Sequence, residues 1–445
     1  MRKFIAAIAL CLILAPTAHA VDQPLTVASR NLYLGADVGV ALELIPDFPA
    51  AAQFMWEQVA ATNFTQRAPG LAKEIIESGA DVVGIQETTH WYCKKNLWSK
   101  KVVVFDFLKE FLAATKTAGS EYVLASKDGV DALNIGYSIP AIPYLTMVTD
   151  PKTFQPLFGS DKAACGFEIG DGIVVKKELK SQILAVGNSE YETSYSIVPQ
   201  LMTIYRGYTW IDLRHQGGNV RIISTHLESL WDSNKVPNAA LQAKQLINDL
   251  SITTMPVIVL GDFNSDPRDP RPDAKSNPGG QPEASETCNA QVKNPTPSTA
   301  IEGCNAYWLM RKAGFTDAGP DAINPNNFTW GMNALLTGPD NKRLKAAQEM
   351  GNATGFTDRL DYIFVKNGAN VISSSIIGNI QPANSRWNTD HAGVVAMVSL
   401  PVNKDVSPAL DSHAPFPISF WNWVGIATFA SILTLMIYRR KRKRE

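Results

Sequence analysis

Short apolar runs that end in polar residues recur along the chain and predict a sheet-rich α/β fold. Segments with apolar residues at helical spacing lie between these runs, and this alternation favours sheets covered by helices. The run LTVASRNLYLGAD, from residue 25, predicts a first strand with Asn31 near its carboxyl end. The other predicted strands span residues 81–87, 122–125, 134–137, 172–175, 182–186, 208–213, 220–226, 256–260, 360–365 and 394–398. The predicted helices span residues 64–78, 105–114, 237–250 and 306–313. We expect irregular, proline-containing or polar insertions at residues 138–170, 267–300 and 331–355.

Polar side chains that could bind a metal or a phosphate follow several of these apolar runs. Strands that finish at one edge of a sheet would bring carboxylates, amides and two imidazoles to a single rim. Such a set is typical of a metal and phosphate site and not of a core. The residues concerned are Asn31, Glu87, His226, Asp262, Asn264, Asp390 and His391.

The stretch MPVIVLGDFNSDP at residues 255–267 shows this transition most clearly. Asp262 and Asn264 follow a β-branched run, and residues two apart in a strand point to the same side. A carboxylate and an amide at this spacing suit a hydrated divalent cation or a phosphate. Asp, Asn, Gly and Pro are also ordinary turn residues, so a simple turn explains this stretch equally well when it is taken alone.

The other residues of the set have structural explanations as well. Glu87 could cap a helix or be a solvated charge, and His226 next to Leu227 could be a hydrogen-bonded core histidine. The pair Asp390 and His391 could form only a turn.

Asp361 is different, because it lies inside the apolar run RLDYIFV, where a carboxylate is costly unless it is paired. We expect it to bond to one ring nitrogen of His391. Such a bond would fix the tautomer and keep the ring protonated in front of a phosphate.

Both ends of the chain carry targeting patterns. Residues 1–20 have the layout of a cleaved secretory signal, with a buried helix as the alternative. Residues 418–438 are uncharged and long enough to span a bilayer, and the basic residues 439–445 predict a cytoplasmic end. We therefore predict a catalytic domain at residues 21–400 outside the cytoplasm, joined by a linker at 401–417 to a single-pass anchor in the cell membrane. A C-terminal sorting signal that is cut off after export is the alternative.

Charge and cysteine content add two constraints. Of the formal net charge of −1, Arg2 and Lys3 contribute +2 and residues 439–445 contribute +5, which leaves −8 for residues 21–438. This acidity argues against, without excluding, a polynucleotide substrate.

Four cysteines remain outside the predicted signal, and they allow three connectivities. We expect the pairs Cys288–Cys304 and Cys93–Cys165, with free buried thiols as the alternative.

The order of these motifs resembles the endonuclease/exonuclease/phosphatase superfamily. The resemblance covers about residues 25–400, and RNLYLGAD at residues 30–37 is similar to a branch of exported bacterial members. Six motifs in order carry it: Asn31, IQE at 85–87, THLE at 225–228, GDFN at 261–264, RLDYIFV at 359–365 and TDH at 389–391.

This resemblance implies an α/β fold in which two mixed sheets pack face to face in a four-layered sandwich, with a Mg²⁺-dependent phosphohydrolase site at one rim. Mn²⁺ or Ca²⁺ could replace Mg²⁺. By the resemblance Glu87 would bind the metal beside Asn31, and Asp390 would assist the metal or the leaving group.

The resemblance also assigns the catalytic roles. Asp262 would orient or deprotonate the attacking water, and Asn264 would bind the phosphate. His391, paired with Asp361, would stabilise the transferring phosphoryl group, and His226 would donate to a non-bridging oxygen. The stretch DGIVVKKEL at 171–179 departs from the family pattern, which puts a transferred phosphate contact there in doubt and leaves Asp171 as a substitute.

The sequence thus predicts a membrane-anchored, extracytoplasmic hydrolase of phosphodiester bonds. Its substrate would be a lipid headgroup or a nucleic acid, and nothing in the sequence indicates an obligate protein partner. One alternative is a secreted nuclease or a sphingomyelinase or phospholipase C-like enzyme, released after C-terminal processing. The other is a binding domain on the same fold.

Overall fold

The computed structural model describes residues 24–45, 47–96, 98–146, 150, 158, 162–198, 202–230, 237–268, 305–352, 354–383 and 385–410 of the 445-residue chain. The predicted signal at residues 1–20, the predicted span at 418–438 and the predicted pair Cys288–Cys304 lie outside the described residues. Within the described ranges, no helix has the length and apolar character needed to cross a membrane.

The first sheet has eight strands, and its central pair, β1 and β2, is parallel while the other pairs are antiparallel. Strands β3 and β7 pair with β2 and β8 outside the main path. In spatial order the main path is β17 (Asn370–Ile377), β18 (Gly393–Ser399), β1 (Leu25–Asn31), β2 (Val82–Lys94), β8 (Lys162–Lys176) and β4 (Tyr122–Leu124), with β3 at Val102–Asp106 and β7 at Leu133–Thr146.

The second sheet has six strands, and here β13 and β14 form the parallel pair. Its spatial order is β15 (Thr316–Asp317), β16 (Asp361–Lys366), β14 (Val257–Asp262), β13 (Gly218–His226), β12 (Gly207–His215) and β9 (Ile183–Glu190). Two small two-stranded sheets accompany them, β5 (Ser126–Lys127) with β6 (Val130–Asp131) and β10 (Tyr195–Val198) with β11 (Met202–Ile204).

The two large sheets pack face to face through a shared apolar core. Val27 and Ile173 of the first sheet belong to the same buried cluster as Ile222, Leu260 and Ile363 of the second. Because both faces of the central strands are covered, these strands are continuous apolar runs, as the sequence pattern predicted.

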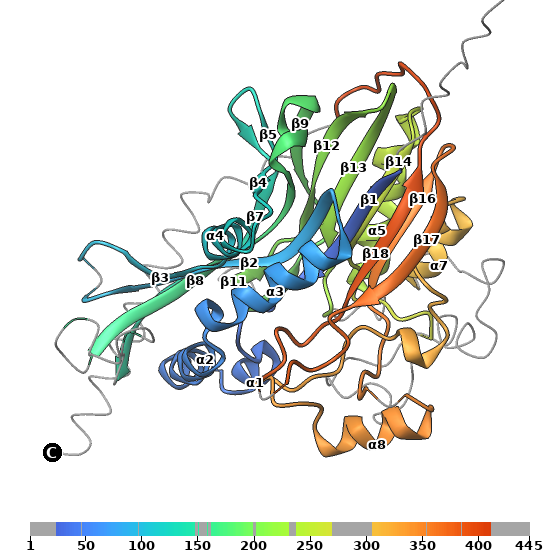
Figure 1. Ribbon diagram of the computed structural model, residues 1–445. Coiled ribbons are helices and arrows are strands. Elements are labelled where there is room, and N and C mark those ends of the chain that lie inside the picture. The colour runs from blue at the N-terminus through green and yellow to red at the C-terminus, as the bar shows by residue number, and fades with distance from the viewer. Residues whose placement is uncertain are drawn as a thin grey trace, which may run out of the picture.

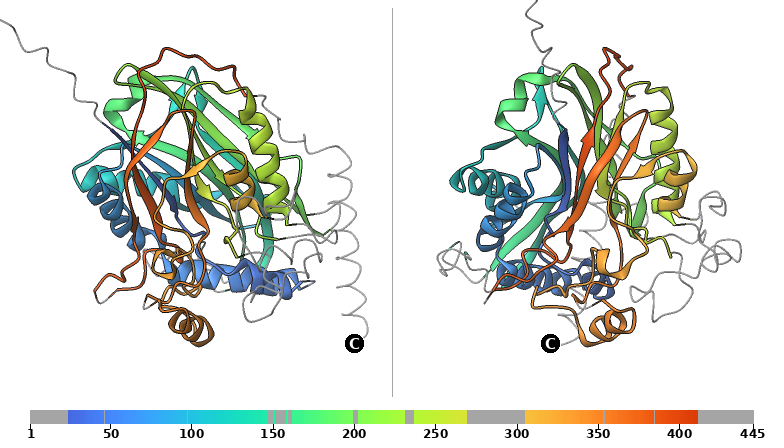
Figure 2. Two further views of the ribbon diagram at one scale, coloured as in Figure 1. Left: turned by 90° about the vertical axis from the view of Figure 1, so that its right-hand side faces the viewer. Right: turned by 45° about the vertical axis from the view of Figure 1, so that its right-hand side comes forward.

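Helices cover the outer faces (Figures 1 and 2). Helices α2 (Phe48–Thr62), α3 (Phe64–Ser78) and α4 (Phe107–Thr117) pack on the first sheet, and α5 (Asn238–Asp249) and α7 (Ala306–Lys312) pack on the second. The resulting order of helix, sheet, sheet and helix agrees with the expected α/β sandwich. Among the described residues, the remaining helices are α1 (Val38–Glu43), α8 (Asn341–Glu349) and the 3₁₀ turns Lys177–Gln182, Leu250–Ile252 and Pro325–Asn327.

Local sequence signals set several element ends. Helix α3 stops at Gly79, whose φ of 72° lies in the left-handed region that glycine adopts without strain. The hairpin between β12 and β13 turns at Gln216 and Gly217, both with positive φ. The predicted polar insertion at 331–355 contains α8, which begins after the N-cap Asp340.

The prediction that the strand at 81–87 ends at Glu87 is wrong. Strand β2 continues to Lys94, because β8 and β3 pair with its second half. The register with β8 shifts between Ile85 and Thr88, so Glu87 lies at a bulge with a φ of 58°. A bulge redirects a side chain within a strand, and here it marks the candidate site.

The prediction of an irregular segment at 138–170 is also wrong at both of its ends. Strand β7 runs to Thr146 and β8 begins at Lys162. Pro140 and Pro143 fall between the residue pairs where the register of β7 with β8 shifts. Proline cannot donate to a ladder, and these irregular positions accommodate it within a strand.

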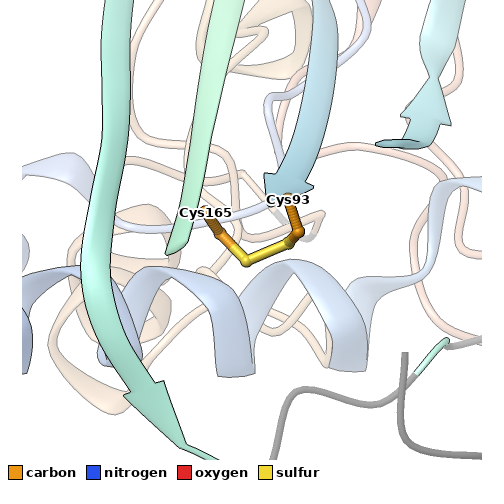
Figure 3. Close-up of a disulfide and its surroundings, with 2 residues drawn as sticks. All are labelled: Cys93 and Cys165. Atoms are coloured by element: carbon orange, nitrogen blue, oxygen red, sulfur yellow. A yellow bond between two sulfur atoms is a disulfide. The ribbon is translucent and has the colours of Figure 1, made fainter. Parts of the chain in front are cut away.

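The disulfide Cys93–Cys165 is present and joins β2 to β8 across 72 residues of sequence. The two cysteines are direct partners in the register of these strands, and Figure 3 shows the bond at the end of β2. This confirms the second of the two predicted pairs.

Candidate active site

The second sheet places three of the predicted site residues side by side. In the register of its strands His226 of β13 is opposite Asp262 of β14, and Asp262 is opposite Asp361 of β16. All three side chains are buried. This row is the direct result of three apolar runs that end or begin at the same edge.

The first sheet brings its predicted residues to the same edge. Asn31 ends β1 opposite Gln86, and Glu87 follows in β2. Asp390 and His391 lie in the segment immediately before β18. Asn31 joins the two sheets, since its Nδ2 donates to Glu87 Oε1 at 3.2 Å and to Asp262 Oδ2 at 3.1 Å.

Asp262 is the centre of the cluster. Its Oδ1 accepts the backbone N–H of Asn264 at 2.9 Å. Its Oδ2 is 3.6 Å from Nε2 of His226 and 3.6 Å from Nε2 of His391. Burial raises the pKa of Asp262, and the two histidines oppose that rise. A buried carboxylate with a raised pKa between two imidazoles can accept a proton from a nearby water.

The expected hydrogen bond between His391 and Asp361 is present. Nδ1 of His391 lies 2.9 Å from Asp361 Oδ2, which leaves Nε2 to face Asp262. Burial lowers the pKa of His391, but Asp361, Asp262 and Asp390 outweigh it and raise this pKa to about 10. The ring is therefore an imidazolium at neutral pH, with its Nε2–H available to an anionic oxygen.

His226 has a more crowded environment. Its Nδ1 is 3.1 Å from Arg206 Nη1 and 3.4 Å from Asp171 Oδ1. Burial and Arg206 lower the pKa of His226, and Asp171 and Asp262 outweigh them and raise it. When the ring is neutral with its proton on Nε2, Nδ1 accepts from Arg206; when the ring is charged, Nδ1–H faces Asp171 and Nε2–H faces Asp262.

Glu87 and Asp390 supply carboxylate oxygens at the more open side of the site, where both are only partly buried. Glu87 Oε2 accepts the backbone N–H of Leu34 at 2.5 Å, and Asp390 Oδ2 accepts Nε1–H of Trp330 at 3.2 Å. Burial, together with the negative charges of Glu87 and Asp262, raises the pKa of Asp390 to about 6 despite the nearby His391.

These oxygen donors fit a hard divalent cation. The carboxylates of Glu87, Asp390 and Asp262 are the ligand type that Mg²⁺, Mn²⁺ and Ca²⁺ prefer. Asn31 turns its Nδ2 toward two of them, while its Oδ1 accepts the backbone N–H of Tyr33 at 2.8 Å. Asp262, Asp361 and His391 also bring potential ligand atoms within 4.8 Å of one another. A cation among those three would have to compete with the Asp361–His391 hydrogen bond, so we favour the oxygen set around Glu87.

Asn264 lies next to the cluster in a strained conformation. Its φ is 44°, and its Nδ2 donates to the carbonyl of Leu227 at 2.7 Å. Tyr33 and Glu87 also have positive φ. Residues held in this region cost free energy and are concentrated at functional sites.

Sequence reasoning did not find two residues of the site. Arg206 lies between β11 and β12, contacts His226 and pairs with Glu228 at 3.1 Å. Trp330 contacts Asp390 and stacks against Arg343, whose guanidinium carbon is 4.5 Å from the ring centroid. In the sequence, each of these two residues stands out only as an isolated arginine or tryptophan in a polar stretch, which is a weak indication of a functional residue.

Comparison with known proteins supplies the family. The sequence model of the endonuclease/exonuclease/phosphatase family matches residues 56–391. No curated protein matches the chain. An endonuclease/exonuclease/phosphatase family protein from Leptotrichia buccalis is 15% identical, with a TM-score of 0.44 over 84% of this chain and 99% of that one.

Two further solved structures are similar to this chain. An endonuclease/exonuclease/phosphatase from Beutenbergia cavernae is 13% identical, with a TM-score of 0.43 over 85% of this chain and 72% of that one. A mannosyl-6-phosphatase from Bacteroides thetaiotaomicron is 15% identical, with a TM-score of 0.40 over 84% of this chain and 99% of that one. The match of the family model over most of the chain is decisive, and the protein belongs to the endonuclease/exonuclease/phosphatase family.

Proposed function

We propose that the protein is a divalent-metal-dependent hydrolase of phosphodiester bonds, anchored to the cell membrane with its catalytic domain outside the cytoplasm. The observation that carries the catalytic part is the buried Asp262 carboxylate between two histidines, one of which is held by Asp361. Membership of a family named for nucleases and phosphatases supports phosphoester hydrolysis. The anchor and the location rest on the predicted signal at 1–20 and the predicted span at 418–438.

In this proposal Asp262 orients the attacking water and takes its proton. Its Oδ1 is held by the Asn264 backbone and its Oδ2 by Asn31, so the carboxylate cannot rotate freely. The raised pKa makes it a better proton acceptor than an exposed aspartate. Asn31 also restrains Glu87, which keeps the two carboxylates in one arrangement.

The histidines stabilise charge on the phosphoryl oxygens. His391 presents a protonated Nε2 whose position is fixed by the Asp361 bond. His226 presents Nε2 from the opposite side of Asp262. Asn264 adds a neutral amide donor. Fixed donors of this kind act without reorganisation in a site that excludes water.

Glu87 and Asp390 would hold the cation, with Asn31 beside them. When bound, Mg²⁺ or a similar ion supplies positive charge that offsets charge developing on the phosphoryl and leaving oxygens. Without it, the carboxylates of this rim would repel an anionic substrate.

A diester is the favoured substrate class because the site is poor in unpaired cations. Arg206 is paired with Glu228, and the surrounding acidic residues suit a singly charged diester better than a doubly charged monoester. A lipid headgroup fits the acidic domain and the predicted anchor, and a nucleic acid fits the generic family chemistry. Release by C-terminal processing would give a secreted nuclease or a phospholipase C or sphingomyelinase-like enzyme with the same site.

The test is an assay of the purified full chain on several substrates. Sphingomyelin, DNA, RNA, bis-p-nitrophenyl phosphate and p-nitrophenyl phosphate would each be offered with Mg²⁺ and with chelator. We expect chelator-sensitive hydrolysis, and faster turnover of the synthetic diester than of the monoester. If no substrate is hydrolysed in a chelator-sensitive way, the proposal is wrong and a binding domain on this fold is the better account.

A further inference from the structure

A hairpin projects from the first sheet beyond the candidate site. We call residues 88–106, the second half of β2 with β3 and their connecting turn, the arm. The pairing runs from His90 with Asp106 to Cys93 with Val102. Strand β1 ends opposite Gln86, so the arm continues past the last residue of its parallel neighbour. Figure 1 shows β3 and the beginning of β8 extending from the body of the molecule.

The end of the arm exposes apolar side chains to solvent. Trp98 is 95% exposed, and Val102 and Val103 on β3 are 41% and 49% exposed. Asn96 and Ser99 hold the turn, since Trp98 N–H bonds to Asn96 Oδ1 at 3.0 Å and Asn96 N–H bonds to Ser99 Oγ at 3.0 Å. Exposed apolar side chains that gather at one place on a soluble domain mark interaction surfaces, and here Trp98, Val102 and Val103 all lie at the end of the arm.

The arm is also strongly basic in an acidic protein. Residues 88–106 contain Lys94, Lys95, Lys100 and Lys101 and a single acidic residue, Asp106 at the base, whereas residues 21–438 are formally negative. Glu168 of β8 pairs with Lys101 at 2.7 Å, while Lys95 and Lys100 are exposed beside Trp98. The surface of the arm therefore attracts anions that the rest of the domain repels.

The arm is attached to the body by a covalent bond and by aromatic packing. The Cys93–Cys165 disulfide ties β2 to β8 where the turn begins, and Trp91 and Phe167 pack at the base with ring centroids 4.5 Å apart. The same strand carries Glu87. Lys94 is seven residues further along, about 23 Å at the usual rise of an extended chain.

The composition of the arm favours a lipid surface over a nucleic acid. Nucleic-acid sites stack bases on aromatic rings, and the exposed valines would have no role in them. Tryptophan, aliphatic side chains and lysines together are the combination found where a protein meets lipid headgroups.

We propose that the arm is a docking surface for a bilayer containing anionic phospholipid, with Trp98 entering the interface and Lys95 and Lys100 contacting the headgroups. The arm projects past the rim that carries Glu87, so a docked bilayer lies toward the candidate site. The docking does not depend on which bond the site breaks.

Hydrogen exchange on the full chain tests this proposal. The chain would be mixed with nanodiscs of phosphatidylcholine alone or with added phosphatidylglycerol, and exchange would be followed in peptides that cover residues 93–104. We expect slowed exchange only with phosphatidylglycerol. Because each lysine near an anionic surface strengthens binding about five-fold, Lys95→Gln/Lys100→Gln should raise the lipid concentration that gives half-maximal protection about 25-fold.

A matched control separates local docking from overall charge. Lys73→Gln/Lys345→Gln removes the same charge from two side chains that are 71% and 78% exposed on other elements. This control variant should leave the slowed exchange of the arm in the presence of phosphatidylglycerol unchanged. Trp98→Ala should weaken protection without changing the hydrolysis of soluble bis-p-nitrophenyl phosphate, which also keeps this test separate from that of the proposed function.

Three results would overturn the proposal. They are equal exchange with and without phosphatidylglycerol, equal effects of the two lysine pairs, and protection of the arm by a single-stranded oligonucleotide instead of by the nanodiscs. The last result would identify the arm as a nucleic-acid contact.

Discussion

The two sheets contribute unlike halves to one site. The second sheet supplies the row His226, Asp262 and Asp361, whose members are 2%, 1% and 0% exposed. The first sheet supplies Glu87 and leads into Asp390, both partly open to solvent. The buried half suits proton transfer and charge stabilisation, because a low dielectric strengthens fixed donors. The open half suits a cation that must enter and keep some of its water.

His391 connects the two halves of the site. It precedes β18 of the first sheet, yet its ring bonds to Asp361 of the second. Asn31, at the end of β1 in the first sheet, also connects them, because it donates hydrogen bonds to Asp262 of the second sheet and to Glu87 of the first. The two halves are therefore coupled by hydrogen bonds. Variants in the buried half should lower turnover, whereas variants in the open half should weaken the binding of the cation.

The largest effects are expected in the buried half. Asp262→Ala and His391→Ala should each reduce turnover about 10³-fold, because a proton acceptor or a fixed cationic donor is lost. Circular dichroism and thermal melting should show a folded domain in both cases. Asp405→Ala and His215→Ala, which lie away from the cluster, are the matched controls. Retained activity in either site variant would mean that the site is misplaced.

Asp361→Asn should have the next largest effect, about a 10²-fold loss of turnover. The neutral amide no longer holds the His391 charge, so the pKa of His391 falls from about 10 toward its ordinary 6.5. The charged ring is present below its pKa, so the alkaline limit of the pH–rate profile should move to lower pH. A slower enzyme whose alkaline limit does not move would show that Asp361 has only a structural role.

A variant in the open half should be rescued by its ligand. Glu87→Gln should weaken the apparent affinity for Mg²⁺ at least about ten-fold. Mutating a residue that only hydrogen-bonds to a metal ligand already lowers metal affinity by about this factor, and Glu87 is itself a proposed ligand. Turnover should recover at high Mg²⁺, which Asp262→Ala should not do. Titration of activity against free Mg²⁺ measures this, and the lack of any shift would remove Glu87 from the metal site.

The smallest effect is expected at the far end of the first sheet. A hydrogen bond to Asp106, with Nε2 and Oδ1 at 3.1 Å, raises the pKa of His90 above 6.5. The hydrogen bond between charged His90 and Asp106 therefore stabilises the arm fully below pH 6.5. This stabilisation is lost as the pH rises through the raised pKa that His90 has in the folded protein. Exchange at residues 102–106, corrected for intrinsic rates, should be slower at low pH by less than about five-fold. His90→Gln should abolish this pH dependence, and an unchanged dependence would contradict the assignment.

The sequence predicted the parts of this molecule that depend on local patterns. Apolar runs predicted the strands that carry Asn31, His226, Asp262 and Asp361, and the cost of a buried carboxylate predicted the Asp361–His391 bond. Asp81 to Glu87 was correctly predicted as a strand, but its extension to Lys94 depends on pairing with β3 and β8, which lie later in the chain.

Other features could not be predicted for related reasons. Arg206 and Trp330 reach the site from connecting segments, where no periodicity marks a side chain that will be brought close by folding. Strand β17 is mostly exposed and rich in serine, so it lacks the apolar pattern of the central strands. The disulfide Cys93–Cys165 depends on the pairing of β2 with β8, which brings together two cysteines 72 residues apart in sequence.

The most direct test of the central claim is whether the two halves act as one site around Asp262. Turnover of bis-p-nitrophenyl phosphate would be measured for Glu87→Gln, Asp262→Ala and the double variant at one fixed, subsaturating Mg²⁺ concentration. Residues that act as a unit give strongly non-additive losses. We predict that the double variant is no slower than Asp262→Ala alone. Losses that multiply would show two independent contributions and contradict the account.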